Sequence, residues 1–405
     1  MKPEEATRAE GQRRLDQFRP RMGRRYANGR NYDRGPGRHR DVSCLSPYIR
    51  RRLVTEQEVI AAALAEHGPE NAEKFVQEVL WRGYFKGWLE RRPQVWVDYV
   101  AGLEADLAAL DGDRALRKRV ERAESGATGL ACFDAWAEEL VETGYLHNHA
   151  RMWFASIWIF TFGLPWRIGA DFFYRHLLDG DPASNTCSWR WVAGLHTRGK
   201  TYAPRAWNIA KFTESRFTPR EADLAPHSRG PEHEEPGGLP DVAPLRAVRT
   251  PEPGVPTALV LTEDDCSLEA FDMDALDIRA AAIVTTGHLR SPRPVSDRVI
   301  AVEAAALGDA AARLGVAPDA MRAGMPGDLA AWADRAGARQ VAMPYVPTGP
   351  LADWTGQARR ALDARGIALT EWRRGWDALV WPHATAGFFK VKKKIPDILA
   401  ASGLS

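Results

Sequence analysis

The spacing of apolar residues divides the chain into two parts. Over residues 55–196, apolar side chains recur three and four positions apart, which is the pattern of amphipathic helices. This spacing predicts helices over residues 56–67, 72–91, 95–110, 133–143, 147–161 and 166–178. Few segments alternate with period two. We therefore expect an all-helical domain, preceded by about 40 residues that are rich in Arg and Gly and resemble a loop.

The pattern changes after residues 227–256, which are rich in Pro, Gly and charge and are typical of a linker. Short apolar runs then alternate with helical stretches. The predicted strands are 258–261, 281–284, 340–344 and 367–371, and the predicted helices are 296–314, 328–336 and 351–365. This alternation indicates a Rossmann-like parallel α/β domain. The predicted organisation is a helical domain (1–226), a linker (227–256) and an α/β domain with a basic tail (257–405).

Composition narrows the class of protein. The chain has 405 residues, of which 45% are hydrophobic, and no apolar run approaches the roughly 20 residues of a membrane span. We therefore expect a soluble, cytoplasmic monomer that does not bind a membrane. The four cysteines are far apart, which argues against a metal centre. No G-x-G-x-x-G follows the first strand, so a dinucleotide dehydrogenase is not supported.

Arginine is concentrated near the N-terminus. Residues 13–52 contain thirteen arginines with Tyr26, Tyr32 and Tyr48 among them. Such a cluster suits a polyanion such as DNA or a phosphate-bearing cofactor. A solubilising basic arm explains it equally well, and both interpretations stay open.

Two segments carry unusual polar groups. Asn148, Arg151 and Met152 are three and four positions apart and share one helical face, which suits a pocket for a polar ring system or a buried helix with one salt bridge. Asp179 and Asp181 follow the helix predicted to end near residue 178. They lack a suitably spaced third ligand for a metal, but they could accept hydrogen bonds from an imide N–H or from ribityl hydroxyls.

These segments resemble the FAD-binding core of the DNA photolyase/cryptochrome family. The matching motifs are T-G-Y-L-H-N-x-x-R-M from residue 143, W-R at 166, H-L-L-D-G-D-x-A-S-N from 176 and W-x-W at 189–191. Upstream, 42-VSCLSPY-48 is similar to the family's T-S-x-L-S-P-Y, with Val42 in place of Thr. The segment 75-FVQEVLWRGYF-85 resembles W-x-x-E-x-x-W-R-E-F-Y, with Phe75 where the family often has Trp.

The resemblance implies that the chain binds FAD in a bent conformation. Arg151 and Asp179 are expected to pair beside the flavin ring, Asp181 to bond the flavin or its ribityl chain, and Asn185 to face flavin N5. The remaining residues that it assigns to the cofactor are Tyr26, Ser43, Leu45, Ser46, Phe75, Glu78, Arg82, Asn148 and Ser184.

The resemblance also implies a reaction, the light-driven splitting of cyclobutane pyrimidine dimers in DNA. The family's lesion-binding positions hold the expected residue types: Glu78, Trp81, Asn148, Met152 and Trp191. A (6–4) photolyase would carry His in place of Asn148 and Met152. His149, where dimer photolyases often have Arg, lacks a permanent charge for a DNA phosphate.

The alternative is a cryptochrome-like FAD photoreceptor or redox protein without repair activity. An incomplete tryptophan chain favours it. Trp189 and Trp166 match the first two members of the family's electron-transfer chain, and the stand-ins for the third are Trp136, Trp153 and Trp158. A flavin-free relative would require the Arg151–Asp179 pair to be only a salt bridge.

The order of the domains departs from the family, in which the α/β antenna domain comes first. Here residues 340–380 resemble the end of that domain but follow the helical part, which implies a rearranged chain. An antenna chromophore, a folate or a deazaflavin, and a purely structural α/β module both stay open.

Overall fold

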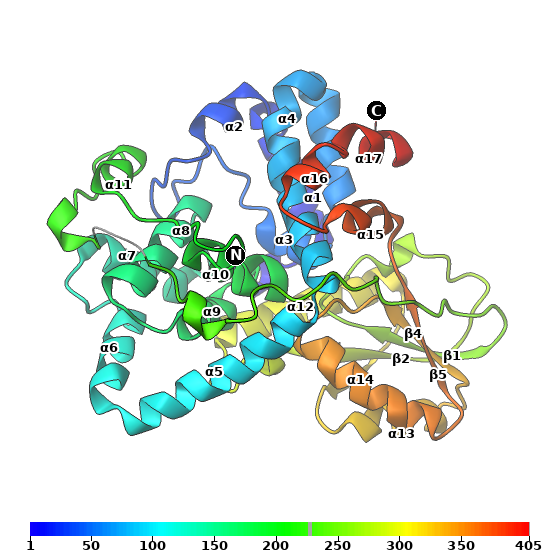
Figure 1. The fold of residues 1–405 in the computed structure, drawn as a ribbon. Helices are drawn as coiled ribbons and strands as arrows, with labels where there is room; N and C mark the ends of the chain where they lie inside the picture. The colour runs from blue at the N-terminus through cyan, green and yellow to red at the C-terminus, as the bar shows by residue number, and fades with distance from the viewer. Residues whose placement is uncertain (226–228, 405) are drawn as a thin grey trace.

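The computed structural model describes residues 1–225 and 229–404. Residues 226–228, which include the start of the predicted linker, and residue 405 lie outside the described part. A helical part and a part built around a sheet lie side by side (Figure 1). The architecture is therefore multidomain, α and α/β, as the periodicity predicts. Within the described ranges, no helix has the length and apolar character needed to cross a membrane.

The helical part is built around one long helix. This helix, α4 (Glu56–Glu90), joins the two helices predicted over 56–67 and 72–91, because the chain kinks at Gly68 (φ 69°) before Pro69 and then continues. A capping box between Thr55 and Glu58 starts it. The other helices are α1 (Arg8–Phe18), α2 (Arg24–Gly29), α3 (Ser46–Arg50), α5 (Gln94–Gly112), α6 (Arg114–Glu124), α7 (Ala131–Thr143), α8 (Asn148–Ser156), α9 (Trp166–His176), α10 (Trp189–Ala193) and α11 (Ala206–Phe212).

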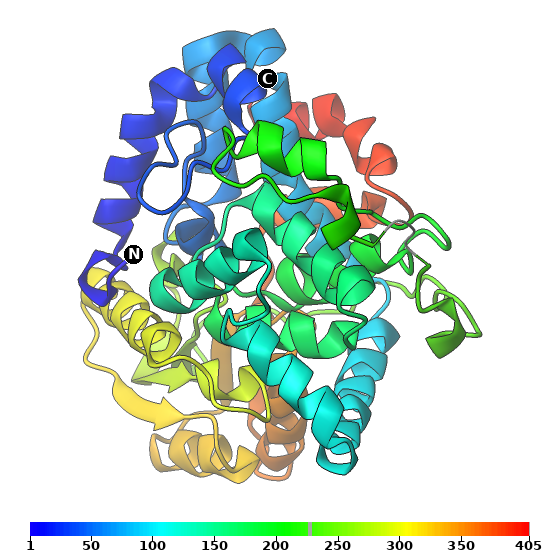
Figure 2. The same cartoon turned by 90° about the vertical axis from the view of Figure 1, so that its left-hand side faces the viewer.

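The N-terminal residues are not the loop that the composition suggests. Thr7 caps α1 by accepting a hydrogen bond from Glu10 N. Gly11, Leu15 and Phe18 are four and three positions apart and form the buried face of this helix. The prediction of a loop is wrong here because the many arginines hide a sparse apolar stripe. Figure 2 shows this N-terminal helix beside the yellow helix of the α/β part.

The second part contains a five-stranded, fully parallel sheet with the order β3-β2-β1-β4-β5. The strands are β1 (Pro256–Leu261), β2 (Asp277–Thr285), β3 (Asp319–Arg322), β4 (Gln340–Pro344) and β5 (Ala368–Trp372), and the intervening helices are α12 (Asp297–Leu314), α13 (Pro326–Arg335) and α14 (Pro350–Asp363). The sequence does not predict β3, because this short edge strand is largely exposed. The strand order reverses between β1 and β4, where parallel sheets form a crevice at their carboxyl ends.

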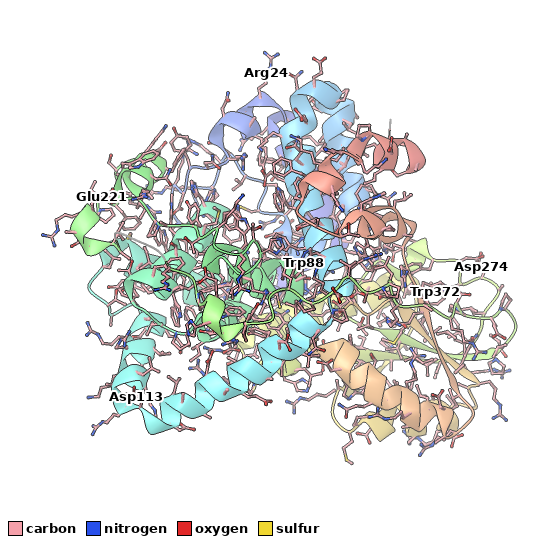
Figure 3. The ribbon with its side chains drawn as sticks, viewed as in Figure 1. Arg24, Trp88, Asp113, Glu221, Asp274 and Trp372 are labelled. Carbon is pink, nitrogen blue, oxygen red and sulfur yellow. The ribbon has the colours of Figure 1, made fainter. Side chains whose placement is uncertain are left out.

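The last helices return to the helical part. They are α15 (Gly375–Val380), α16 (Phe389–Lys392) and α17 (Ile395–Ala401), and Figure 1 shows them in red beside α4. Gly87 of α4 allows a close approach, since a Cβ atom there would lie 2.7 Å from the Cα atom of Trp381. Figure 3 places Trp88, near the end of α4, in the middle of the molecule. The domain boundaries 1–226, 227–256 and 257–405 stay a prediction.

Candidate functional site

A buried cluster of charges joins four segments of the helical part. Arg151 of α8 binds Asp179 with two hydrogen bonds of 3.0 Å. Arg82 of α4 lies 3.7 Å from the same carboxylate, and the hydroxyl of Ser46, at the start of α3, also bonds to it. Burial alone would raise the pKa of Asp179, but the two guanidinium groups lower it. Asp179 is therefore held as a carboxylate between two fixed cations.

Asn185 completes this cluster. In the amide orientation that satisfies its partners, the Asn185 oxygen accepts a hydrogen bond from Arg151 Nη1 at 2.7 Å, and its nitrogen donates to the backbone oxygen of Asp179 at 2.6 Å. The side chain is 8% exposed, so its orientation is set by these partners and not by water. The structure thus brings Arg151, Asp179 and Asn185 together, as the resemblance implies, while their contacts with a flavin stay a prediction.

Asp181 shapes the turn that carries Asn185. Its Oδ1 atom accepts hydrogen bonds from the backbone N–H groups of Ala183 and Ser184, at 3.0 and 2.8 Å, and from the Ser184 hydroxyl at 3.1 Å. Its Oδ2 atom lies 3.6 Å from the ammonium group of Lys86. Burial acts to raise the pKa of Asp181, but Lys86 and nearby arginines lower it to about 2. The motif does not include Lys86, although its place one helical turn after Arg82 puts it on the same face of α4.

The loop expected to hold the FAD phosphates lies before α3. Ser43 Oγ accepts a hydrogen bond from Leu45 N at 3.3 Å, and Cys44 has a left-handed backbone with φ 52°. Leu45 is fully buried, whereas Ser43 and Ser46 are partly exposed. Ser46 contacts Asp179, so this loop reaches the charge cluster directly.

A second group of predicted residues lies along α4. Phe75 packs edge-on against Tyr26 with ring centroids 4.9 Å apart. Glu78, one turn along, forms a 3.0 Å ion pair with Arg30 and lies 3.7 Å from Lys74. Sequence reasoning missed the role of Arg30. Its position four residues after Tyr26 is the signal that could have identified it, because the two share one helical face.

The unpaired donors of this region fit a ligand with phosphate and carbonyl oxygens. Arg82 Nη1 and Arg30 Nε are buried atoms that have no hydrogen-bond partner within the described residues. A buried donor without a partner costs about 1–3 kcal/mol, which an acceptor oxygen of a ligand would offset. Both donors lie beside predicted cofactor-binding residues, Asp179 and Glu78. The donor set therefore fits FAD.

The residues expected to face a DNA lesion are less open than the motif suggests. The indole ring of Trp81 is stacked on Phe388 of the C-terminal segment, with ring centroids 3.9 Å apart and planes 15° from parallel. Trp191 is 37% exposed and packs against Tyr202 at 5.6 Å. Asn148 is exposed at the start of α8, and Met152 is partly buried. No local pattern links Phe388 to Trp81, so the sequence could not predict this contact.

The tryptophans expected to carry electrons separate into groups. Trp189 contacts Trp158 edge-on at 6.4 Å, whereas Trp166 packs against Tyr99 at 6.0 Å. Gly169 makes room for the first pair, since a Cβ atom there would lie 2.5 Å from the Trp189 ring and 2.9 Å from the Trp158 ring. Trp136 and Trp153 stack on each other at 5.4 Å. Among the three stand-ins, Trp158 is therefore the one in contact with Trp189.

The crevice between β1 and β4 is filled by an ionic network. Glu263, which follows β1, binds Arg290 at 2.9 Å and Arg51 at 2.9 Å, and lies 3.4 Å from Arg50. The free space left among these and neighbouring side chains is about 20 Å³, enough for a single water molecule. As it stands, this crevice has no room for a folate or a deazaflavin.

Comparison with known proteins identifies the helical part. Residues 75–220 match the family model "FAD binding domain of DNA photolyase". The deoxyribodipyrimidine photo-lyase of Streptomyces griseus is 36% identical over 157 residues, which cover 38% of this chain and 33% of that protein. A cryptochrome DASH of Ostreococcus tauri is 33% identical over 178 residues, which cover 43% of this chain and 29% of that protein.

A solved class III photolyase from Agrobacterium tumefaciens is 26% identical, with a TM-score of 0.43, over 51% of this chain and 43% of the other. The chain spans about a third of the length of the first curated relatives that it matches. The matched region contains the charge cluster of Arg82, Arg151, Asp179 and Asn185, which fits FAD. Residues 75–220, which contain this cluster, are thus similar to the FAD-binding domain of photolyases and cryptochromes.

Proposed function

We propose that this protein is a light-driven, FAD-dependent photolyase that splits cyclobutane pyrimidine dimers in DNA. One observation carries the proposal: the face of α8 that carries Asn148 and Met152 also carries Arg151, which is hydrogen-bonded to Asp179 and Asn185. A helix with this face can contact a cofactor through Arg151 and a substrate through Asn148 and Met152. The amide of Asn148 would bond to the carbonyl groups of a flipped-out pyrimidine pair.

FAD, when bound and reduced, supplies an electron after it absorbs blue light. The protein provides fixed charges around that cofactor. Arg151 and Arg82 are permanent cations that favour negative charge beside them, and Asp179 balances them. Asp181 holds the turn that orients Asn185, so the amide needs little rearrangement during the reaction.

On the DNA side, Trp191 provides an aromatic surface that is already partly exposed. Stacking of a base on an aromatic side chain contributes about 1–3 kcal/mol to binding of a single strand. Glu78 is held by Arg30 and lies three residues before Trp81 in α4. Phe388 covers one face of the partly exposed Trp81 ring, so a base could stack on that face only if the C-terminal segment moved.

A second candidate is an FAD photoreceptor or redox protein without repair activity, and two contacts favour it. Phe388 covers Trp81. The imidazole of His149 stacks on Trp153 at 4.1 Å, and its Nδ1 atom lies 3.1 Å from the Asn31 carbonyl. Burial lowers the pKa of His149, so this side chain is neutral near pH 7 and offers no charge to a DNA phosphate.

The two candidates are separated by a direct assay. The purified full chain is loaded with FAD, reduced under blue light, and mixed with a single-stranded oligonucleotide that contains one thymine dimer. Loss of the dimer in the light, and not in the dark, is the expected result. Reduction of bound FAD without loss of the dimer would favour the photoreceptor. Failure to bind FAD would exclude both.

A further inference from the structure

A wide hollow lined by arginines lies between two surface loops. The loops are residues 33–41, which follow α2, and residues 213–216, which follow α11. The hollow measures about 660 Å³ and opens to the solvent. Its charged lining residues are Arg21, Arg34, Arg38, Arg40, Arg216 and Glu214. The lining thus has five cationic side chains and one anionic side chain.

Asp33 fixes both walls of this hollow. Its fully buried carboxylate accepts hydrogen bonds from Trp136 Nε1 at 2.9 Å, from Arg216 at 2.6 Å and from Gly35 N at 3.0 Å. Its own N–H donates to the Phe212 carbonyl at 2.8 Å. One carboxylate therefore ties the two loops to each other and to α7. The loops that carry the arginines are therefore held in place by buried hydrogen bonds.

Part of the positive charge in the hollow is not neutralised. Arg34 is paired with Asp41 and Glu214, and Arg216 is paired with Asp33. By contrast, Arg38 and Arg40 are exposed, and neither has a carboxylate partner in the part of the chain that the structure describes. Guanidinium groups in this state bind phosphate groups with paired hydrogen bonds.

The hollow lies beside His149, the neutral residue that stands where a cation for a DNA phosphate is expected. His149 bonds to the Asn31 carbonyl just before the first loop, and its ring lies 5.1 Å from that of Phe212, just before the second. The N-terminal end of α8, with Asn148, is thus flanked by the two walls. A strand lying in the hollow would continue onto the exposed start of α8.

We propose that this hollow binds the sugar-phosphate backbone of a nucleic-acid strand, with Arg38 and Arg40 as phosphate ligands. The inference rests on the proposed function only in taking that strand to be the DNA that carries the lesion. Guanidinium groups, and not stacking rings, dominate the lining, so binding would be independent of base sequence. The shape also favours a strand over a single nucleotide, because the hollow is open and its free charges lie on an exposed loop.

The test uses the full chain in the dark and an undamaged, labelled oligothymidine, so it does not depend on repair. Binding is measured by fluorescence anisotropy at several salt concentrations. Because each phosphate contact on a single strand adds about 0.7 to the slope of log K against log salt, R38A/R40A should reduce that slope by about 1.4 and weaken binding about tenfold at low salt. R38K/R40K should keep most of the slope.

A matched control removes the same charge from the distant sheet part. Arg335 ends α13 and Arg365 follows α14, and both side chains are exposed, so R335A/R365A should leave the slope unchanged. An R38A/R40A slope equal to that of the unaltered chain would overturn the inference. Displacement of the strand by equimolar pyrophosphate would also overturn it, since it would indicate a small phosphate ligand. Unchanged FAD content in R38A/R40A is expected, and its loss would assign the hollow to the cofactor instead.

Discussion

The cofactor side and the substrate side of the candidate site differ in how completely they are formed. On the cofactor side, Asp179 is held by two fixed bonds from Arg151, with Arg82 nearby, and Asn185 has one orientation. On the substrate side, Phe388 covers Trp81 and a neutral imidazole replaces an expected cation. The difference teaches that the groups expected to hold the flavin are already in place, whereas those expected to meet DNA are covered or uncharged.

The largest effect is expected at the centre of the cofactor side. Asp179→Asn removes the charge that compensates Arg151 and Arg82, and breaking a buried ion pair in this way costs about 3–5 kcal/mol. We expect a fall of that size in the free energy of unfolding, measured by urea denaturation, together with loss of bound FAD. Asp274→Asn, an exposed residue at the rim of the molecule (Figure 3), is the matched control. Equal free energies of unfolding for the two variants would show that the buried charges around Asp179 do not stabilise the cofactor side of the site.

The next effect concerns pH. Burial lowers the pKa of His147 to about 3, so the folded chain keeps this imidazole neutral while the unfolded chain protonates it below about pH 6.5. Stability should therefore fall as the pH drops from 6.5 towards 3, by about 1.4 kcal/mol per pH unit for this one group. The measurement is the free energy of unfolding from pH 7 to pH 4.5.

His147→Asn sharpens this test. His147 Nδ1 accepts a hydrogen bond from His149 N at the start of α8, and an Asn side chain can supply the same cap. In this variant, the number of protons taken up on unfolding should be smaller by about one. His176 and His196, whose pKa values burial lowers to about 4, should still contribute to the pH dependence of stability. An unchanged pH profile would show that His147 binds its proton equally well in the folded and the unfolded chain, which would contradict the burial of a neutral imidazole.

On the substrate side, Phe388→Ala should uncover Trp81. The stacked pair contributes about 0.5–1.5 kcal/mol beyond its buried area, so its loss should raise the affinity for a dimer-containing strand up to about tenfold. Phe389→Ala is the control, because that neighbouring side chain is 75% exposed. Equal affinities of the two variants, measured by anisotropy, would show that Trp81 takes no part in binding.

The smallest effect is expected in the path of electrons through the protein. Trp158 contacts Trp189, whereas Trp153 stacks on Trp136. Trp158→Phe should therefore slow the reduction of bound FAD by blue light more than Trp153→Phe does, as followed by flavin absorbance. The opposite order would favour a path through the stacked pair.

Residue spacing predicted the features of the fold that depend on neighbouring residues in the sequence. The spacing of apolar residues located α5, α7 and β4, and the i, i+3, i+4 spacing placed Asn148 and Arg151 on one face. The contacts that decide the substrate side join distant segments. Phe388 on Trp81 and Glu263 on Arg51 depend on how the last part of the chain folds back, and no residue spacing encodes that return. The many arginines around α1 also led to the wrong prediction of a loop, because they made its sparse row of buried apolar residues hard to recognise.

The central claim is tested most directly by counting thymine dimers in a defined single strand after blue light. The full chain, with FAD bound and reduced, is compared with Phe388→Ala under the same light and in the dark. We expect dimers to disappear only in the light, and faster with Phe388→Ala because Trp81 is then free to stack on the lesion. Unchanged dimers with both proteins, while the flavin is reduced, would contradict repair as the function of this chain.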